Sequence, residues 1–355
     1  MGSTSSAIGA VLQDNGDRET RNNLTQVKGG RAWQNGDVTS IEVLTGDPFA
    51  WEVRGTRSAV AIGVFDGVHL GHQQVLRTLT KRADEVEGVG VALTFDPHPL
   101  EFVDPSRAPK LLTSIDERAS VMESCGVGIM GVLPFVQIRD LEPHLFVTEI
   151  LSYRLNAAWV AVGDNFRFGH NRSGDPALLE RAGLELGFEV DIVSMIGDDA
   201  RDVVSSTRIR GELEHGRVSE AARLLGRRFS LTGPVVHGDA RGRTIGFPTA
   251  NLHIPDRMAV PADGVYAVFA WLGHRRLPAV VNIGVRPTFE VNVRAVEVHL
   301  LDFSEDIYGE EIAVEFVERI RGEHRFESLD ALVAQIGEDV EVARTLLSER
   351  NGRDA

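Results

Sequence analysis

The chain has 355 residues, of which 43% are hydrophobic and 25% charged, so its composition is that of a soluble globular protein with two domains. Its formal net charge of -15 argues against binding of nucleic acid or acidic membranes, so any bound phosphate needs backbone amides, a few placed cations or a divalent metal. The single cysteine, Cys125, excludes an internal disulfide framework and favours the cytoplasm, and the sequence has neither a long apolar segment nor a secretory signal that would predict a membrane role.

Residues 1–40 are rich in Gly, Ser, Asn and Asp without apolar periodicity, which predicts a disordered tail. From about Ser58 onward, short apolar runs alternate with amphipathic stretches that have helical spacing. The apolar runs occupy residues 59–65, 89–95, 129–135, 159–162 and 188–193, and residues 71–86 form the clearest helical stretch. This order predicts a doubly wound, Rossmann-like α/β domain over residues 41–226, and ligands bind at the carboxyl ends of its parallel strands.

A second domain is expected over residues 227–350. Apolar residues at helical spacing over 212–228 predict a helix that closes the first domain. Short alternating runs punctuated by Gly and Pro then predict strands at residues 264–271, 277–283, 295–301 and 312–317. These strands favour an antiparallel sheet or small barrel, and an apolar stripe from Leu329 to Leu347 predicts a final helix that packs against it.

The first chemical motif is the run AIGVFDGVHLGHQ at residues 61–73, which predicts a strand, a glycine-rich turn and the start of a helix. Glycines let the backbone approach a polyphosphate, the helix start offers free N–H groups, and His69 and His72 lie on one face. We expect the turn to surround the phosphates through Gly63, Phe65, Asp66, Gly67 and Gly71. A zinc-binding histidine pair is the alternative interpretation.

A second phosphate-binding motif is the run VVSSTRIR at residues 203–210. Ser205, Ser206 and Thr207 at the start of a helix offer hydroxyls and amides to a phosphate, and Arg210 adds a fixed positive charge. A plain helix N-cap is the alternative interpretation of the same residues.

The third motif is GPVVHGDARGRTIGFPTANL at residues 233–252. Its glycines, Gly238, Gly242 and Gly246, allow backbone amides to wrap a phosphate chain. Thr249 and Asn251 alternate onto one face of an extended segment, where two neutral oxygens suit Mg²⁺ bound through a nucleotide. A hairpin loop with a capping threonine is the simpler alternative.

The first two motifs, together with TFDPHP at 94–99 and GDNFRFGHNRSGD at 163–175, resemble bacterial FMN adenylyltransferases of the nucleotidylyltransferase superfamily. The resemblance implies that the FMN phosphate attacks the α-phosphorus of ATP and releases pyrophosphate. It places His69, His72 and Arg210 at the ATP phosphates with the Ser205–Thr207 hydroxyls. It places the flavin nucleotide at Asp96, His98, Asn165 and Phe166. The chain departs from many relatives at Val64, where they carry Asn, and from some at Asn165, where they carry Asp.

The segments GFPTAN, GVYAV, VNIGVRPTF, EVHLLDF and IYGEEIAVEFVERIR are similar to the flavokinase family and occur in the same order. This similarity implies a closed six-stranded antiparallel barrel that transfers the ATP γ-phosphoryl group to the ribityl hydroxyl of riboflavin. Glu297 is the implied general base, and Thr249 and Asn251 hold Mg-ATP. The loop that approaches the flavin contains Asn282, Arg286 and Thr288.

Together the motifs identify the chain as a member of the bacterial bifunctional riboflavin kinase/FMN adenylyltransferase, or FAD synthetase, family. The resemblance implies riboflavin, FMN, FAD and ATP as small-molecule partners and Mg²⁺ as cofactor. Two alternatives stay open: only one of the two sites is active, or the protein is a non-catalytic flavin sensor. A nucleic-acid regulator is the weakest interpretation because of the net charge, and the sequence does not reveal the oligomeric state.

Overall fold

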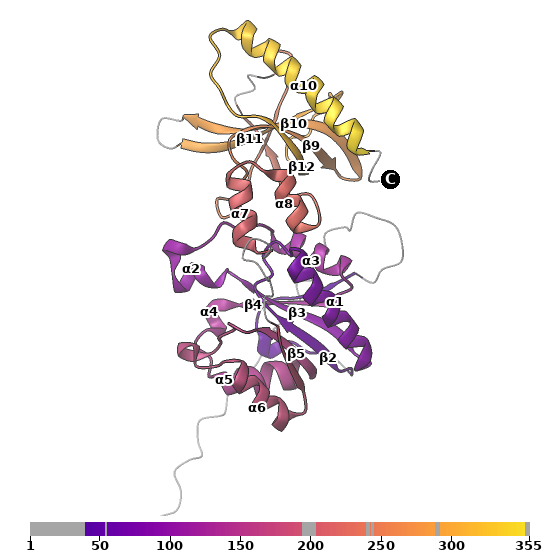
Figure 1. The fold of residues 1–355 in the computed structure, drawn as a ribbon, viewed down its shortest axis with the longest axis vertical. Coiled ribbons are helices and arrows are strands. Elements are labelled where there is room, and N and C mark those ends of the chain that lie inside the picture. Colours follow the sequence, from indigo (N-terminus) through magenta and orange to yellow (C-terminus); the bar gives the residue numbers. More distant parts are fainter. Residues whose placement is uncertain are drawn as a thin grey trace, which may run out of the picture.

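A parallel sheet with helices on both faces is followed by a closed barrel in this computed structural model (Figure 1). The structure describes residues 40–53, 55–193, 204–238, 242, 245–287 and 292–351. The predicted tail at residues 1–40 therefore lies almost wholly outside the described residues.

The N-terminal sheet has six strands, all paired in parallel, in the order β1-β4-β3-β2-β5-β6. The strands are β1 (Glu42–Leu44), β2 (Ser58–Ile62), β3 (Val89–Asp96), β4 (Ile129–Pro134), β5 (Ala157–Gly163) and β6 (Glu189–Val193). Every residue of β2 is buried, as expected for a central strand covered on both faces. The strand order reverses between β2 and β5, so a ligand crevice is expected where these strands end.

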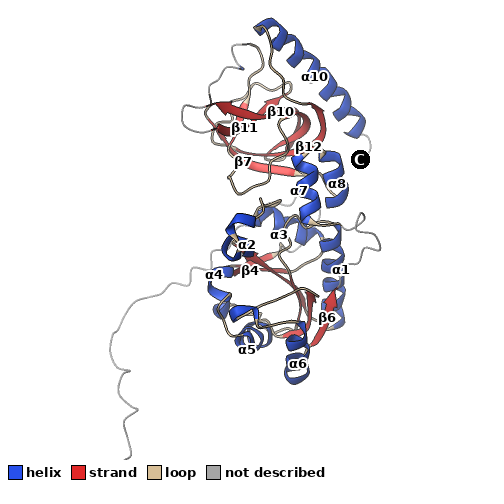
Figure 2. Cartoon of the chain, turned by 60° about the vertical axis from the view of Figure 1, so that its left-hand side comes forward, coloured by secondary structure: helices blue, strands red, loops and turns tan. Residues whose placement is uncertain are grey.

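Helices cover both faces of this sheet (Figure 2). One face packs against α1 (Leu70–Glu85) and α3 (Ile115–Ser124) through small and apolar residues. The other packs against η3 (Phe146–Arg154) and α6 (Pro176–Leu186). The remaining short helices are η1 (Pro48–Ala50), α2 (Pro99–Val103), η2 (Pro105–Arg107), α4 (Phe135–Ile138), α5 (Pro143–Leu145) and η4 (His170–Arg172). The doubly wound α/β prediction is confirmed.

Two helices, α7 (Ser206–Glu214) and α8 (Val218–Leu225), join the sheet to the barrel. The single helix predicted over 212–228 is therefore wrong, because the chain turns at Gly216 with φ of 72° and starts a new helix. Apolar residues of both helices share one buried cluster with the barrel interior, so the two helices and the barrel have a common core.

The C-terminal part is a closed antiparallel barrel with strand order β10-β11-β8-β7-β12-β9. Its strands are β7 (Ser230–Val236), β8 (Ala250–Leu252), β9 (Gly264–Leu272), β10 (Arg275–Pro287), β11 (Asn292–Leu300) and β12 (Glu311–Arg321). Closure removes the free strand edges that an open sheet would expose. The predicted six-stranded barrel is confirmed.

The final helix, α10 (Leu329–Asn351), lies across the outside of the barrel (Figure 1). Val340, Ala343 and Leu347 are buried against β9, β10 and β12, whereas Leu329 is exposed. The apolar stripe predicted from the sequence therefore packs through its C-terminal part.

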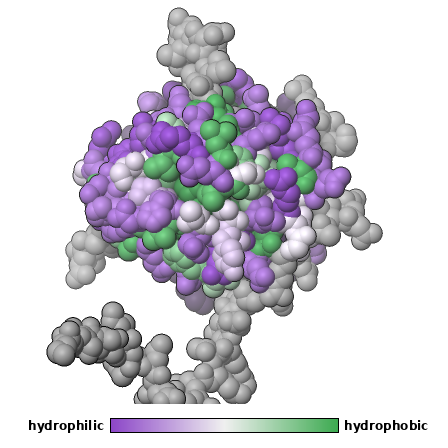
Figure 3. All heavy atoms as spheres, turned by 90° about the horizontal axis from the view of Figure 1, so that it is seen from below, coloured by the Kyte–Doolittle hydropathy of each residue, from purple (hydrophilic) through white to green (hydrophobic). Residues whose placement is uncertain are grey.

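The end of the molecule opposite the barrel is mainly hydrophilic, with a few hydrophobic groups between the polar ones (Figure 3). Of the helices in the described part of the chain, none combines the length and the hydrophobicity needed to span a membrane.

Candidate active sites

The turn between β2 and α1 bends the backbone sharply at the carboxyl end of the sheet. Phe65, Gly67 and Val68 all have positive φ angles, between 38° and 81°. A Cβ atom at Gly63 would lie 3.1 Å from the Phe65 ring, and one at Gly67 would lie 2.8 Å from Leu112. Gly67 is favoured by its left-handed backbone, whereas a Cβ atom at Gly63 would need the Phe65 ring to shift by a few tenths of an ångström. The predicted role of both glycines in admitting a phosphate remains a prediction.

His69 and His72 form a stacked pair at the start of α1. Their ring centroids are 3.7 Å apart with an interplanar angle of 16°. His69 is the N-cap of α1, and its Nδ1 accepts a hydrogen bond of 3.3 Å from the His72 N–H, so its ring proton resides on Nε2. Burial lowers the pKa of His69 to about 4 and the pKa of His72 well below 6.5. Both rings are therefore neutral near pH 7 and act as hydrogen-bonding groups rather than cations.

Asp66 is buried beneath this pair and holds two arginines. Its carboxylate lies 2.6 Å from Nη2 of Arg210 and 3.8 Å from Nη2 of Arg118. It also accepts hydrogen bonds from the backbone N–H groups of Leu112 and Thr113 at 2.9 and 3.2 Å. These partners hold the carboxylate beside Arg210, and the predicted phosphate contact of Asp66 remains a prediction.

The start of α7 lies against this turn. Ser205 caps the helix by accepting the Arg208 N–H, and Ser206 Oγ donates to the backbone oxygen of Asp66 at 2.8 Å. Thr207 is exposed beside them. Capping and phosphate binding are compatible here, since the helix start still offers backbone N–H groups to an anion.

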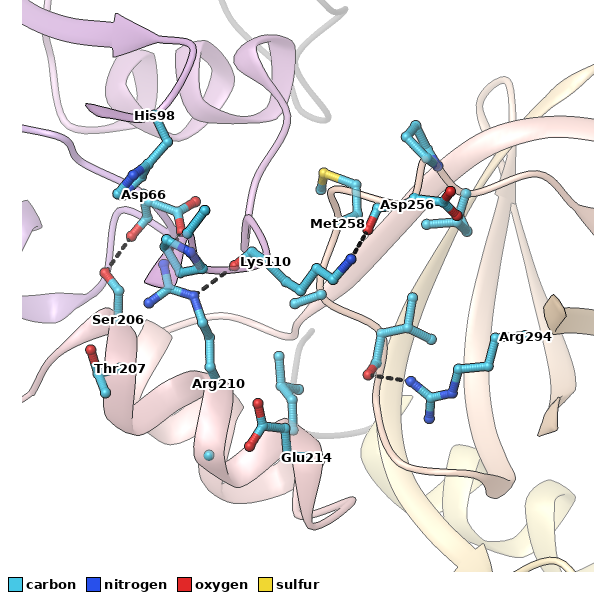
Figure 4. A pocket seen from close by; sticks show the side chains of 18 of the residues that line it. Asp66, His98, Lys110, Ser206, Thr207, Arg210, Glu214, Asp256, Met258 and Arg294 are labelled. Atoms are coloured by element: carbon cyan, nitrogen blue, oxygen red, sulfur yellow. Dashed lines mark hydrogen bonds and ion pairs between the residues drawn. The ribbon is translucent and has the colours of Figure 1, made fainter. Parts of the chain in front are cut away.

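One large cavity, of about 1630 Å³, brings these groups together (Figure 4). The sheet side and α7 contribute most of the residues predicted for adenylyl transfer, namely Asp66, His69, His72, His98, Asn165, Ser205, Ser206, Thr207 and Arg210. The opposite wall comes from the barrel, which contributes residues that the sequence did not indicate, among them Asp256, Met258 and Arg294.

Two predicted flavin residues lie away from this cavity's lining. Phe166 stacks on Phe168, with centroids 5.3 Å apart, and packs against the core below the sheet. Asp96 pairs instead with Arg257 of the barrel, with 3.2 Å between Oδ1 and Nη1. His98 does line the cavity and caps α2 by accepting the Leu100 N–H.

A second cavity, of about 360 Å³, lies between the barrel and α10. Glu297, Thr249, Gly242 and Asn282 line it, as the sequence predicted for a kinase site. Thr249 Oγ1 and Glu297 Oε2 are 3.5 Å apart.

The remaining kinase-site predictions have different outcomes. Asn251 faces Glu297 in the β8–β11 register and borders the large cavity. A Cβ atom at Gly238 would overlap the Asn251 amide, and one at Gly242 would lie 2.3 Å from the Phe247 oxygen, so both glycines permit close backbone approach. Gly246 has φ of 86° in the following turn. Arg286 belongs to β10, and Thr288 lies outside the described residues.

Sequence reasoning missed the apolar wall of the second cavity. Phe247, Phe326 and residues of α10 such as Ile336 and Val340 form this wall. The phenylalanines stand in the motif GFPTAN and in the run HRFES before α10, so their aromatic character was the available signal. A flat apolar ring system suits such a wall, and Glu297 lies at its polar side.

Fold and sites together define a class: an ATP-using transferase with two sites, one on a nucleotidylyltransferase-like sheet and one in a flavokinase-like barrel. Residues 53–208 match the family model described as FAD synthetase. Residues 225–347 match the family model described as riboflavin kinase. Residues 209–224, which include most of α7, the turn at Gly216 and α8 except its last residue, lie between these two matches.

Relatives over most of the chain agree with both models. The chain is 41% identical over 287 residues to the bifunctional riboflavin kinase/FMN adenylyltransferase of Escherichia coli K12, covering 80% of this chain and 91% of the relative. The Haemophilus influenzae enzyme of the same name is 38% identical, covering 82% and 94%. A Streptococcus pneumoniae crystal structure described as a macrolide-efflux protein shares the fold, with a TM-score of 0.73, 35% identity and coverage of 82% and 94%. The chain belongs to the bifunctional riboflavin kinase/FMN adenylyltransferase family, and both activities reside in it, one in each half.

Proposed function

We propose that the two cavities are the two active sites: riboflavin is phosphorylated to FMN in the barrel cavity, and FMN is adenylylated to FAD at the carboxyl end of the sheet. The observation that carries the proposal is the convergence of two neutral histidines, an oriented arginine and a helix N-terminus on one cavity. We further propose a division into residues 41–226 and 227–350, in a cytoplasmic enzyme that takes riboflavin, FMN and ATP as substrates.

In the adenylyl transfer, a phosphate oxygen of FMN attacks the α-phosphorus of ATP, and the bond to the bridging oxygen of pyrophosphate breaks. No protein nucleophile is required. His69 donates from Nε2 to a phosphoryl oxygen, while Arg210 and the free N–H groups at the start of α7 balance the growing negative charge. Asp66 keeps the Arg210 guanidinium in place during this step. Catalysis then consists of orientation and charge stabilisation.

In the kinase reaction, the ribityl hydroxyl oxygen attacks the γ-phosphorus of ATP, and ADP leaves. Glu297 receives the hydroxyl proton, because among the three carboxylates that line the small cavity, with Glu323 and Asp339, it is the one hydrogen-bonded to Thr249. Phe247 and Phe326 hold the isoalloxazine ring by apolar contact.

The side chains beside Glu297 suit Mg²⁺. Thr249 Oγ1 and Glu297 Oε2 are 3.5 Å apart, and oxygen ligands of this kind are what Mg²⁺ takes alongside nucleotide phosphates. When bound there with ATP, Mg²⁺ would neutralise charge on the transferring phosphoryl group. Thr249 would hold it, whereas Asn251, the other residue predicted from the sequence, lines the large cavity instead.

The test is incubation of the purified protein with riboflavin, ATP and Mg²⁺, with FMN and FAD separated by chromatography. We expect FMN and then FAD from the parent, at least a hundredfold less FMN from Glu297→Ala, and accumulated FMN without FAD from His72→Ala. Supplying FMN to Glu297→Ala should restore FAD formation, which shows that this variant is folded. Flavin binding without either product from the parent would refute the enzymatic roles and favour a sensor.

A further inference from the structure

Residues 96–111 contain the predicted flavin residues Asp96 and His98, and the barrel contacts this segment at both of its ends. Arg257, in the loop after β8, pairs with Asp96 at the end of β3, with 3.2 Å between Nη1 and Oδ1. Leu111 N–H donates to the Arg257 backbone oxygen at 2.7 Å, and Ala259 N–H donates to the Leu111 oxygen at 2.8 Å. Lys110 Nζ adds a hydrogen bond to the Asp256 oxygen (Figure 4). One short stretch of the barrel thus holds both ends of residues 96–111.

Residues 96–111 form one side of the large cavity. His98 stands two residues after Asp96 and lines the cavity, as do Arg107 and Lys110 near the other end. Between them lie only α2 and η2, which bury no residue of their own. With so little apolar packing to hold it, the segment depends on its end contacts for its position.

The ATP-phosphate side of the cavity meets residues 96–111 where Arg210 Nε donates to the Lys110 backbone oxygen at 2.6 Å (Figure 4). Arg210 is fixed by Asp66, and Ser206 Oγ bonds the Asp66 backbone oxygen. None of these contacts uses the Arg257 side chain, and the bond from the Leu111 N–H goes to the Arg257 backbone oxygen, which a side-chain substitution retains. A change at Arg257 therefore acts on the flavin side and leaves the phosphate side in place.

We infer that Arg257 is a positioning residue for FMN in the adenylyl transfer, although it belongs to the kinase barrel. It acts through Asp96, which sets where His98 meets the ligand, and this inference rests on the proposed assignment of the large cavity. The barrel therefore serves the second reaction as well as the first. Neither chemical step requires the Arg257 charge at the reacting atoms.

The experiment compares Arg257→Ala, Arg257→Lys and the parent in full-length protein, with FMN and ATP varied separately. The pair is partly exposed, so its loss should raise the KM for FMN between about twofold and fivefold. The KM for ATP in adenylyl transfer, the kcat for FAD formation and the rate of riboflavin phosphorylation should stay at the parent values. Arg257→Lys, which keeps the charge, should recover part of the FMN affinity.

Arg275→Ala is the matched control. Arg275 is also a barrel arginine with 48% side-chain exposure, and it pairs with Glu305 at 2.9 Å. It should leave the KM for FMN unchanged. An unchanged KM for FMN in Arg257→Ala, or equal losses in both reactions, would overturn the inference. Absence of FAD from the parent would instead reject the proposed function.

Discussion

Burial keeps the His69 and His72 side chains uncharged near pH 7. Because an uncharged native histidine disfavours proton binding, the stability of the protein depends on pH. In the native state the pKa of His69 is about 4, against 6.5 for an ordinary histidine. Between these pH values the unfolded chain binds a proton at this position and the native protein does not. The contribution of neutral His69 to the unfolding free energy is therefore fully present at pH 7 and is lost as the pH falls from 6.5 towards 4.

We predict that His69→Asn weakens this dependence. Asparagine is a good N-cap and retains an acceptor for the His72 N–H, but it does not titrate. Between pH 7 and pH 4 the parent should lose on the order of 2 to 3 kcal/mol more unfolding free energy than the variant. Urea denaturation at several pH values measures this. Parallel pH profiles for the two proteins would contradict the buried, neutral state of His69.

At the scale of elements, the link between sheet and barrel depends on how α8 ends. Gly226 closes α8 with φ of 72°, and a Cβ atom there would lie 2.5 Å from Leu70 Cδ2 at the start of α1. Gln73 of α1 also donates to the Leu225 oxygen at 2.8 Å. The end of α8 is therefore fixed by both backbone conformation and contact with the helix that carries the histidines.

Two glycine substitutions in helices should consequently have opposite effects. Gly226→Ala should lower the unfolding free energy by about 1 to 2 kcal/mol, because alanine disfavours the left-handed conformation and displaces Leu70. Gly337→Ala, in the middle of α10 with nothing within 4 Å of a new Cβ atom, should raise it by about 0.5 to 1 kcal/mol. Urea midpoints measure both. A neutral or stabilising Gly226→Ala would show that this cap is not required.

At the scale of the whole molecule, a partly buried ion pair joins the two parts. Arg227 donates to the Gly67 oxygen at 2.8 Å and lies 3.8 Å from Glu117 of α3. Ser230, the first residue of β7, donates to the same Glu117 carboxylate. Burial raises the pKa of Glu117, while the positive charge of Arg227 opposes this shift. The turn of the adenylyl-transfer site and the barrel are thus coupled through one carboxylate.

We predict that Arg227→Met destabilises the protein in a pH-dependent way. Without the cation the pKa of Glu117 rises further, so the native state binds a proton more readily than the unfolded chain, and the loss of stability grows as the pH rises above about 5. At pH 8 the loss should be on the order of 1 to 3 kcal/mol.

The neighbouring change Arg228→Met is the control for Arg227→Met. Arg228 pairs with Glu315 at 3.7 Å, wholly within the barrel. Its substitution should cost a similar or smaller amount at every pH. Thermal or urea unfolding at pH 5, 6, 7 and 8 compares the two. An Arg227→Met loss that does not change with pH would exclude Glu117 as the group left uncompensated.

The sequence by itself determined the two folds, both motif sets and many of the residues that line the two cavities. Apolar runs report which strands are buried, and motifs such as HLGH and GFPTAN place reactive groups relative to their own strand, because both effects act over a few residues. The division of labour between the two halves follows from the same local patterns, and the family models match the same halves.

Only the tertiary structure decided what depends on contacts between distant residues. The pairing of Asp66 with Arg210 spans 144 positions, and that of Asp96 with Arg257 spans 161, so no local pattern indicates either. The same holds for the apolar wall that α10 adds to the small cavity, whereas the turn at Gly216 has a local signal in the glycine itself. Composition and spacing report on residues that are close in the sequence. Burial and charge pairing depend on which distant residues the fold brings into contact.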